Sequence, residues 1–500
     1  MQTFTVIDLL EDAVKKHPNR ILYEDEKEKI TFAQVFESSK KIATKISEVA
    51  MPNTPIAVLS EKCVYTPAYY LGILFAGCFY VPLGTDAPAA RLNHILETTD
   101  VKVLLTDNIS EKHLDNLEFK GQKIKVEECD SVNPEKINER RSQITNGNPQ
   151  HIIFTSGSTG KPKGVVTNHG SVVEYIKTFS DTFGFDKQTV LGSQAPFEYD
   201  AAVRDMFLPL CTGCKTVLIP KQLFSDPIKL FEYVKEKKIN TLIWAASAFT
   251  LSYELDVFSK VSPPRLEKLF FIGSVMQPQI LKYLSSHFPN TTIVNHYGPT
   301  ETTASCTYYI TSRNKDYSAG IPIGKPFRNR GVFLVGDDNK QCKSGDVGEI
   351  YISGTCVGNG YYNNSWKTAE VFVQNPLHNK YRDIVYKTGD LGKTDCDGNL
   401  LFLGRRDRQI KFMGYRIELE EIEFSAAGCL NIKDVACVFD DSKNTIILFY
   451  TGTATSKDIA IELRKRLPSF MVPRKFIQID SMPKLFNGKV DMQKLKNMHN

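Results

Sequence analysis

The stretch Phe154-Thr155-Ser156-Gly157-Ser158-Thr159-Gly160-Lys161-Pro162-Lys163-Gly164 follows directly on an apolar run at residues 152–154. Its glycines allow close approach of the backbone to a ligand, its hydroxyl and N–H groups are donors, and its lysines are cationic. This combination suits a polyphosphate. It is not a Walker P-loop, because Lys161 precedes Pro162 and Thr155 stands where that motif needs its first glycine. We therefore predict a phosphate loop of another kind, with a flexible polar turn as the alternative.

A dinucleotide-binding motif is excluded as well. The segment Gly358-Asn359-Gly360 has Asn363 where the third glycine of that motif belongs.

Around the loop, short apolar runs alternate with stretches of helical periodicity. Strands separated by helices imply βαβ units and a largely parallel sheet. Beyond Val332 the runs are short and broken by Gly, Asp and Asn, which predicts smaller antiparallel or barrel-like elements. The expected strands in the first region are residues 56–59, 103–105, 152–154, 216–219 and 242–244, and the expected helices there include residues 6–14 and 32–46.

The composition excludes several classes of protein. The chain has 500 residues, 42% of them hydrophobic and 24% charged, which is normal for a globular protein and long enough for more than one domain. A net charge of +5 gives no reason to expect nucleic-acid binding. The longest apolar run, Tyr69 to Gly84, is shorter than the roughly 20 residues of a membrane helix and predicts a buried helix followed by a strand. The scattered cysteines, 11 in number, and the absence of a signal-peptide pattern favour a cytoplasmic protein with reduced thiols.

Two further segments carry polar groups after apolar runs. In Asn295-His296-Tyr297-Gly298-Pro299-Thr300-Glu301, the ring of Tyr297 can stack on a purine and Glu301 is a hard oxygen ligand for Mg²⁺. In Tyr386-Lys387-Thr388-Gly389-Asp390-Leu391, Asp390 can accept from ribose hydroxyls. Taken singly, each segment is also compatible with a solvated turn.

Together and in this order, these segments resemble the adenylate-forming superfamily. The branch is that of the amino-acid adenylation domains of nonribosomal peptide synthetases and the D-alanine–carrier-protein ligases. The resemblance extends over nearly the whole chain and includes residues 71–86, 348–362, 404–411 and 487–491. It implies a large N-terminal domain (1–406) of parallel-sheet α/β subdomains with a small β-barrel-like part. It also implies a small, mobile α+β C-terminal domain (407–500) and a requirement for ATP and Mg²⁺.

The resemblance assigns roles to individual residues. Asn295 and Tyr297 would hold adenine, Thr300 the α-phosphate, Glu301 the magnesium, and Asp390 with Arg405 the ribose. Phe402 stands where relatives often have a tyrosine, so a hydroxyl contact there is lost. The residues expected to close over the β- and γ-phosphates are Thr155, Ser156, Gly157, Ser158, Thr159, Gly160 and Lys163.

Lys489 is the expected catalytic cation. By resemblance it would lie between the attacking carboxylate and the α-phosphate, where negative charge accumulates during adenylation. It belongs to the smaller domain, so the two domains must close for this step and Lys489 must leave before a thiol can attack. Asp407 matches the hinge position of the family, with a turn or helix cap as the alternative.

The segment containing Asp200 matches the part of the family that holds the substrate's amino group. A carboxylate in a partly dry pocket needs a cationic partner, which implies an α-amino acid, although Asp200 could instead pair with Arg204. Arg204, with Ser247 and His296, could receive a polar or acidic side chain, and both small and acidic side chains remain open. Alternatively, Arg204 pairs with Asp205 or points away from the pocket. The full expected pocket comprises Asp200, Ala201, Arg204, Ser247, Phe270, Ile272, His296, Ala304 and Ser305.

We therefore expect an ATP-dependent amino-acid–carrier-protein ligase. It would be free-standing, load the phosphopantetheine thiol of a separate carrier, and bind neither nucleic acid nor membrane. Basic residues at 464–466 and 474–475 offer a face for an acidic carrier, or are simply solvated charges. An acyl- or aryl-CoA ligase and a catalytically inactive nucleotide-binding protein are the alternatives. Asp200 counts against the first, and Lys489, Glu301 and Asp390 count against the second.

Overall fold

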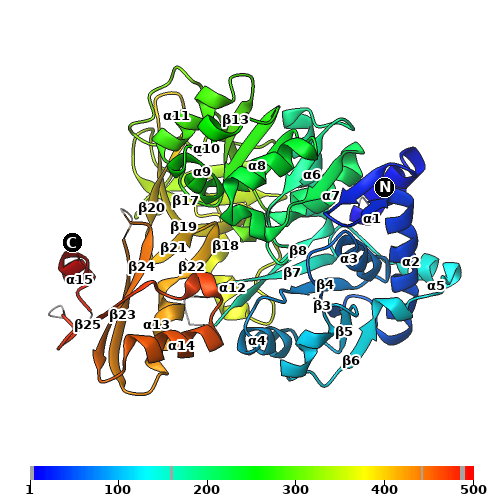
Figure 1. Ribbon diagram of the computed structural model, residues 1–500, viewed down its shortest axis with the longest axis horizontal. Helices are drawn as coiled ribbons and strands as arrows, with labels where there is room; N and C mark the ends of the chain where they lie inside the picture. Colours follow the sequence, from blue (N-terminus) through cyan, green and yellow to red (C-terminus); the bar gives the residue numbers. More distant parts are fainter. Residues whose placement is uncertain (1–4, 158–160, 441–442, 485–489, 500) are drawn as a thin grey trace.

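The computed structural model describes residues 5–157, 161–440, 443–484 and 490–499. Helices and strands occur throughout this part of the chain (Figure 1). We call residues 5–406 the N-terminal segment and residues 407–499 the C-terminal segment. In Figure 1 the C-terminal segment, orange to red, lies along one side of the molecule.

The largest sheet has a parallel centre with antiparallel strands at both edges. Its central strands are buried apolar runs, as expected for a sheet covered by helices on both faces. The expected strands at 216–219 and 242–244 are confirmed within one or two residues. The strands, in spatial order, are β15 (Lys325–Pro326), β14 (Thr307–Ile310), β13 (Thr292–Tyr297), β12 (Lys268–Ile272), β11 (Thr241–Ala245), β9 (Val190–Ser193), β10 (Lys215–Leu218), β1 (Ile21–Glu24) and β2 (Lys29–Thr31).

A second, mostly parallel sheet carries the predicted phosphate loop. Its last two strands form an antiparallel hairpin in which Thr155 pairs with Lys163, so the loop joins two hydrogen-bonded strand ends. The spatial order is β6 (Gln122–Lys125), β5 (Val103–Thr106), β3 (Pro55–Leu59), β4 (Phe79–Leu83), β7 (Pro149–Thr155) and β8 (Lys163–Asn168).

Beyond residue 330 the sheets are small and mainly antiparallel, as the broken apolar pattern predicts. In the N-terminal segment, one sheet is formed by β16 (Arg330–Val335), β17 (Gly348–Gly354), β19 (Ile384–Thr394), β18 (Phe372–Gln374) and β20 (Leu400–Arg405). In the C-terminal segment, β21 (Gln409–Phe412) pairs with β22 (Tyr415–Glu418), and β23 (Ile432–Asp440), β24 (Thr445–Gly452) and β25 (Lys475–Gln478) form a sheet.

Helices cover these sheets, and their ends follow local signals. The first helix begins after Thr5, whose side chain and that of Asp8 form a capping box. The expected buried helix and strand between Tyr69 and Gly84 are confirmed as α3 and β4. None of the helices in the described ranges combines the length and the apolarity that crossing a membrane requires. The N-terminal segment contains α1 (Val6–Lys16), α2 (Phe32–Val49), α3 (Thr66–Phe75), α4 (Ala89–Thr99), α5 (Pro134–Ser142), α6 (His169–Phe183), α7 (Ala202–Thr212), α8 (Pro227–Glu236), α9 (Thr250–Glu254), α10 (Val257–Lys260), α11 (Pro278–His287) and α12 (Ser365–Val371), and the C-terminal segment contains α13 (Leu419–Ala427), α14 (Ser456–Arg466) and α15 (Met492–His499).

Candidate active site

The phosphate loop is anchored at both ends by the β7–β8 hairpin. A Cβ atom added to Gly157 would lie 2.1 Å from the Lys161 carbonyl oxygen, so the close approach of the two strand ends requires glycine here. The Thr155 hydroxyl oxygen is buried and has no hydrogen-bond partner among the described residues, which leaves it available to a ligand. Three predicted phosphate contacts, Ser158, Thr159 and Gly160, lie outside the described residues.

The C-terminal segment contacts this loop directly. The Ser156 hydroxyl donates to the Arg416 carbonyl oxygen at 2.7 Å, and the Gly157 N–H donates to Glu421 at 3.3 Å. Glu421, on α13, also forms an ion pair with Arg91 on α4 at 3.1 Å. The loop therefore lies at the boundary between the two segments.

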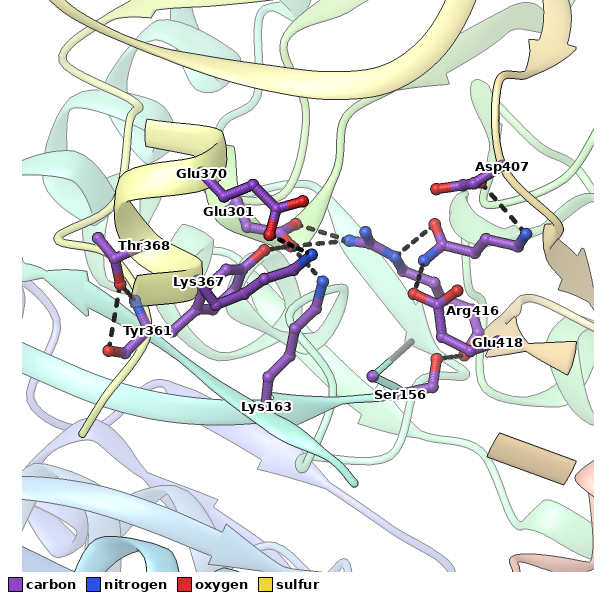
Figure 2. Close-up of polar contacts among 12 residues, drawn as sticks. Ser156, Lys163, Glu301, Tyr361, Lys367, Thr368, Glu370, Asp407, Arg416 and Glu418 are labelled. Atoms are coloured by element: carbon purple, nitrogen blue, oxygen red, sulfur yellow. Dashed lines mark hydrogen bonds and ion pairs between the residues drawn. The ribbon is translucent and has the colours of Figure 1, made fainter. Parts of the chain in front are cut away.

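Glu301 is fully buried at the centre of a polar cluster (Figure 2). One terminal nitrogen of Arg416 donates to both of its carboxylate oxygens, at 2.9 and 2.7 Å. The Tyr361 hydroxyl donates to it at 2.7 Å, and the ammonium of Lys163 lies 3.6 Å away. The predicted magnesium ligand thus has a cationic partner from each of the two segments.

These contacts determine the protonation states in the cluster. Burial alone would raise the pKa of Glu301, but Arg416 and Lys163 hold it well below its usual range, so the carboxylate is ionised at pH 7. Burial, together with Arg416, lowers the pKa of Lys163 to about 8. An ionised buried carboxylate is a suitable ligand for Mg²⁺ beside the oxygens of a substrate phosphate. Within the described part of the chain, no three His, Cys, Asp or Glu side chains are grouped as metal ligands.

The predicted adenine and ribose contacts lie close together. Asn295 and Tyr297 share one face of β13, because side chains alternate along a strand. The amide nitrogen of Asn295 donates to the Pro322 carbonyl at 2.8 Å, and the Tyr297 hydroxyl donates to Asp390 at 2.5 Å. The ring of Phe402 is 6.4 Å from that of Tyr297.

Asp390 is connected to the predicted hinge through Arg405. Arg405 forms an ion pair with Asp390 and donates to both carboxylate oxygens of Asp407, at 2.6 and 2.7 Å. From the C-terminal segment, the ammonium of Lys411 lies 5.3 Å from the centre of the Tyr297 ring. A nucleotide bound here would meet groups from both segments.

The predicted side-chain pocket lies on the opposite face of β13 from Asn295 and Tyr297. His296 is buried among aromatic rings, with Phe270 of β12 at 5.2 Å between ring centres. Arg204 of α7 is fully buried and donates to the Ser305 hydroxyl at 2.9 Å, and Ala304 beside it is buried in a left-handed conformation (φ 64°). The remaining pocket residues are partly exposed, namely Asp200, Ala201, Ser247 and Ile272.

Asp200 precedes α7 and faces both Arg204 and Thr300. Burial raises its pKa, and Arg204 and a hydrogen bond with Thr300 act in the opposite direction. No lysine or arginine of the described chain comes within ion-pair distance of its carboxylate. The alternative in which Arg204 pairs with Asp200 is therefore wrong for this structure.

Three further residues, Arg416, Glu421 and Arg330, lie at or beside the site, and no motif in the sequence predicts them. Arg416 lies in a strand of alternating polar and apolar residues a few positions after the quoted 404–411 motif, and this was the only available signal. Arg330 is buried and donates to the Ser305 carbonyl and to Glu174, behind the pocket. The predicted catalytic residue Lys489 lies outside the described residues. All eleven cysteines are described, and all are free thiols.

Comparison with known proteins places the chain among adenylation enzymes. A family model described as AMP-binding enzyme matches residues 10–362. Gramicidin S synthase 2 of Brevibacillus brevis is 31% identical over 508 residues, covering 99% of this chain and 11% of that protein. The chain thus spans about a tenth of that relative. Zwittermicin A synthase ZmaJ of Bacillus cereus is 29% identical, covering 97% of this chain and 94% of that protein.

Solved structures of the same kind share the fold. The Vibrio cholerae adenylation domain AlmE, in complex with glycyl-adenosine-5'-phosphate, superposes with a TM-score of 0.86 at 19% identity, covering 100% of this chain and 99% of that one. A nonribosomal peptide synthetase protein containing adenylation and carrier domains, PA1221, has a TM-score of 0.84 at 22% identity, covering 99% and 84% of the two chains. The predicted α/β fold is confirmed.

Proposed function

The chain belongs to the AMP-binding enzyme family, and on that premise we propose that it activates an amino acid as an aminoacyl adenylate and passes it to a carrier protein. In the first step, a carboxylate oxygen of the amino acid attacks the α-phosphorus of ATP, and the bond to the bridging oxygen breaks to release pyrophosphate. In the second, the phosphopantetheine thiol of the carrier attacks the carbonyl carbon and AMP leaves.

The proposal rests mainly on the carboxylate of Asp200. This residue is partly exposed, and its carboxylate hydrogen-bonds with Thr300 and forms no ion pair with a lysine or arginine of the described residues. A partly buried carboxylate without such a partner favours a ligand that brings its own cation, as the ammonium of an α-amino acid does. The relatives support the same choice, since they include gramicidin S synthase 2 and the adenylation domain AlmE in complex with glycyl-adenosine-5'-phosphate.

The residues around the nucleotide have separate roles in this proposal. Thr155, with its buried free hydroxyl, and Lys163 would hold phosphate oxygens. Asp390 and Arg405 would bind the ribose, and Tyr297 with Asn295 the adenine. Mg²⁺ bound at Glu301 would neutralise charge on the transferring phosphate, and Lys489 would stabilise the transition state from the C-terminal segment. Residues 407–499 would act as a separate domain that turns about Asp407.

Amino-acid-dependent exchange of pyrophosphate into ATP tests the proposal. We expect exchange with at least one of the twenty common amino acids or D-alanine, and none with fatty or aryl acids. Exchange with non-amino acids alone would establish the acyl- or aryl-CoA ligase instead. Transfer to a carrier is measured separately, as acylation of a phosphopantetheinylated carrier protein.

Lys489→Ala is expected to lower the exchange rate by about 10²- to 10³-fold, because preorganised charge at a transition state contributes on this scale. ATP binding should persist, as measured by calorimetry. Lys494→Ala, an exposed change on α15, is the matched control. An unchanged rate in Lys489→Ala would exclude this lysine from the mechanism.

A further inference from the structure

The guanidinium of Arg204 is buried, and one of its donor edges forms no hydrogen bond with the described residues. Its side chain is fully buried, and its Nη1 atom donates to the hydroxyls of Ser305 at 2.9 Å and Tyr175 at 3.2 Å. The Nε and Nη2 atoms have no hydrogen-bond partner within the described ranges. These two atoms share one side of the planar guanidinium, and their N–H groups are spaced to meet the two oxygens of a carboxylate.

No carboxylate of the described chain occupies that edge. Asp200 and Asp205 attract Arg204 electrostatically, but neither forms an ion pair with it. Asp205 hydrogen-bonds with Ser193 and is attracted by Lys62. A buried guanidinium is normally paired, because burial of an isolated charge is costly. The described residues supply no such partner, which favours an anionic ligand at this edge.

The groups beside Arg204 are also suited to an anion. Both ring nitrogens of His296 are buried and unpartnered. Burial, with Arg204 nearby, holds the pKa of His296 well below its usual value, so the ring is neutral at pH 7 and has one N–H to donate. The Ser305 hydroxyl accepts from Arg204 and retains its own hydrogen to donate. The buried groups around Arg204 thus offer several donors.

We propose that the amino acid activated by this protein is dicarboxylic, and that its side-chain carboxylate binds the Nε–Nη2 edge of Arg204. This inference rests on the proposed function, since it assumes that Asp200 holds the α-ammonium. The two residues are four positions apart, and Asp200 is partly exposed whereas Arg204 is fully buried. A substrate with a cation at one end and an anion at the other matches this order of charges.

The unmodified enzyme provides the first test. Pyrophosphate exchange is measured with L-aspartate, L-glutamate and L-α-aminoadipate, with the amides asparagine and glutamine, and with alanine and leucine. We expect one of the acids to be the best substrate. Where its amide is in the panel, the acid should exceed it by about 10- to 150-fold in kcat/KM, the range for a hydrogen bond to a charged group. A neutral amino acid as best substrate overturns this inference and leaves the proposed function standing. The absence of exchange with any amino acid overturns the proposed function itself.

Arg204→Met and Arg204→Lys provide the second test. Methionine keeps the length of the side chain without its charge, and lysine keeps the charge without the planar edge. We expect the preference for the acid over its amide to disappear in Arg204→Met and to fall in Arg204→Lys. Arg140→Met is the control. Arg140 is also buried, but it donates to the carbonyls of Ser47 and Ala50, and none of these three residues belongs to the predicted pocket. An unchanged preference in a folded Arg204→Met enzyme refutes the assignment. If that variant does not fold, the result with the unmodified enzyme decides alone.

Discussion

Replacement of Arg416 by methionine is expected to loosen the contact between the two segments. Arg416 belongs to β22 of the C-terminal segment, and its ion pair with Glu301 crosses to the N-terminal segment. The Glu301 side chain is fully buried and that of Arg416 is 13% exposed, so solvent screens the pair little. Loss of the guanidinium leaves a buried carboxylate that has lost its principal partner.

The free-energy cost of the replacement depends on the partners that Glu301 keeps. Removal of one member of a buried ion pair costs about 3–5 kcal/mol. Lys163 and the Tyr361 hydroxyl still contact Glu301 after the replacement, so we expect the lower end, about 3 kcal/mol. Since about 1.4 kcal/mol is a tenfold change in an equilibrium, the segments should separate on the order of 100-fold more often.

Amide hydrogen exchange measures this directly. The amide of Gly157 should lose protection in Arg416→Met, because it donates to Glu421 of α13 only while the segments are together, as the Ser156 hydroxyl donates to the Arg416 carbonyl. Arg408→Met is the matched control. Arg408 donates to both carboxylate oxygens of Glu423, at 3.0 and 2.6 Å, but both residues lie in the C-terminal segment. Equal protection in the two variants would show that the Arg416–Glu301 pair does not hold the segments together.

Two further predictions concern Glu421 and Arg330. Burial raises the pKa of Glu421 to about 7 despite its ion pair with Arg91, so the joined segments bind a proton that the separated segments release. The joined arrangement should therefore lose stability as the pH rises from about 4.5 through 7, by up to about 3 kcal/mol, and Glu421→Gln should flatten this dependence in hydrogen exchange between pH 5 and 8. Arg330→Met should lower the free energy of unfolding by about 3 kcal/mol in a denaturant titration, because Arg330 pairs with Glu174 and holds the Ser305 carbonyl. A Glu174→Gln second change should recover part of that loss, and a loss below about 1 kcal/mol in Arg330→Met would contradict the role given to the pair.

Local sequence patterns predicted several of the helices and strands correctly. The strand at 152–154, the buried helix and strand within 69–84, and the change to short antiparallel strands after 332 all follow from hydrophobic periodicity and turn residues, which act over a few positions. The same applies to the loop 154–164, because its glycines and hydroxyls are consecutive in the sequence.

Pairing between distant residues was not predictable in this way. Arg416 and Glu301 are far apart in the chain, and only the tertiary contact between β22 and the turn that follows β13 brings them together. For the same reason, the sequence offered Arg204 two carboxylates within five positions, whereas the structure leaves its Nε–Nη2 edge unpaired. Local spacing determines which pairs are possible, and tertiary packing determines which of them form.

The predicted nucleotide contacts and the predicted side-chain pocket differ in how their charges are neutralised. The predicted nucleotide contacts Glu301 and Asp390 are already paired, with Arg416 of the C-terminal segment and with Arg405 beside the predicted hinge. If the nucleotide and its metal bind as proposed, they exchange partners with these arginines. Their binding is then linked to the position of the C-terminal segment, and this linkage acts equally in both directions. Arg204 has no carboxylate partner of this kind among the described residues. Recognition of the substrate side chain should accordingly be independent of where the C-terminal segment lies, whereas binding of ATP should not.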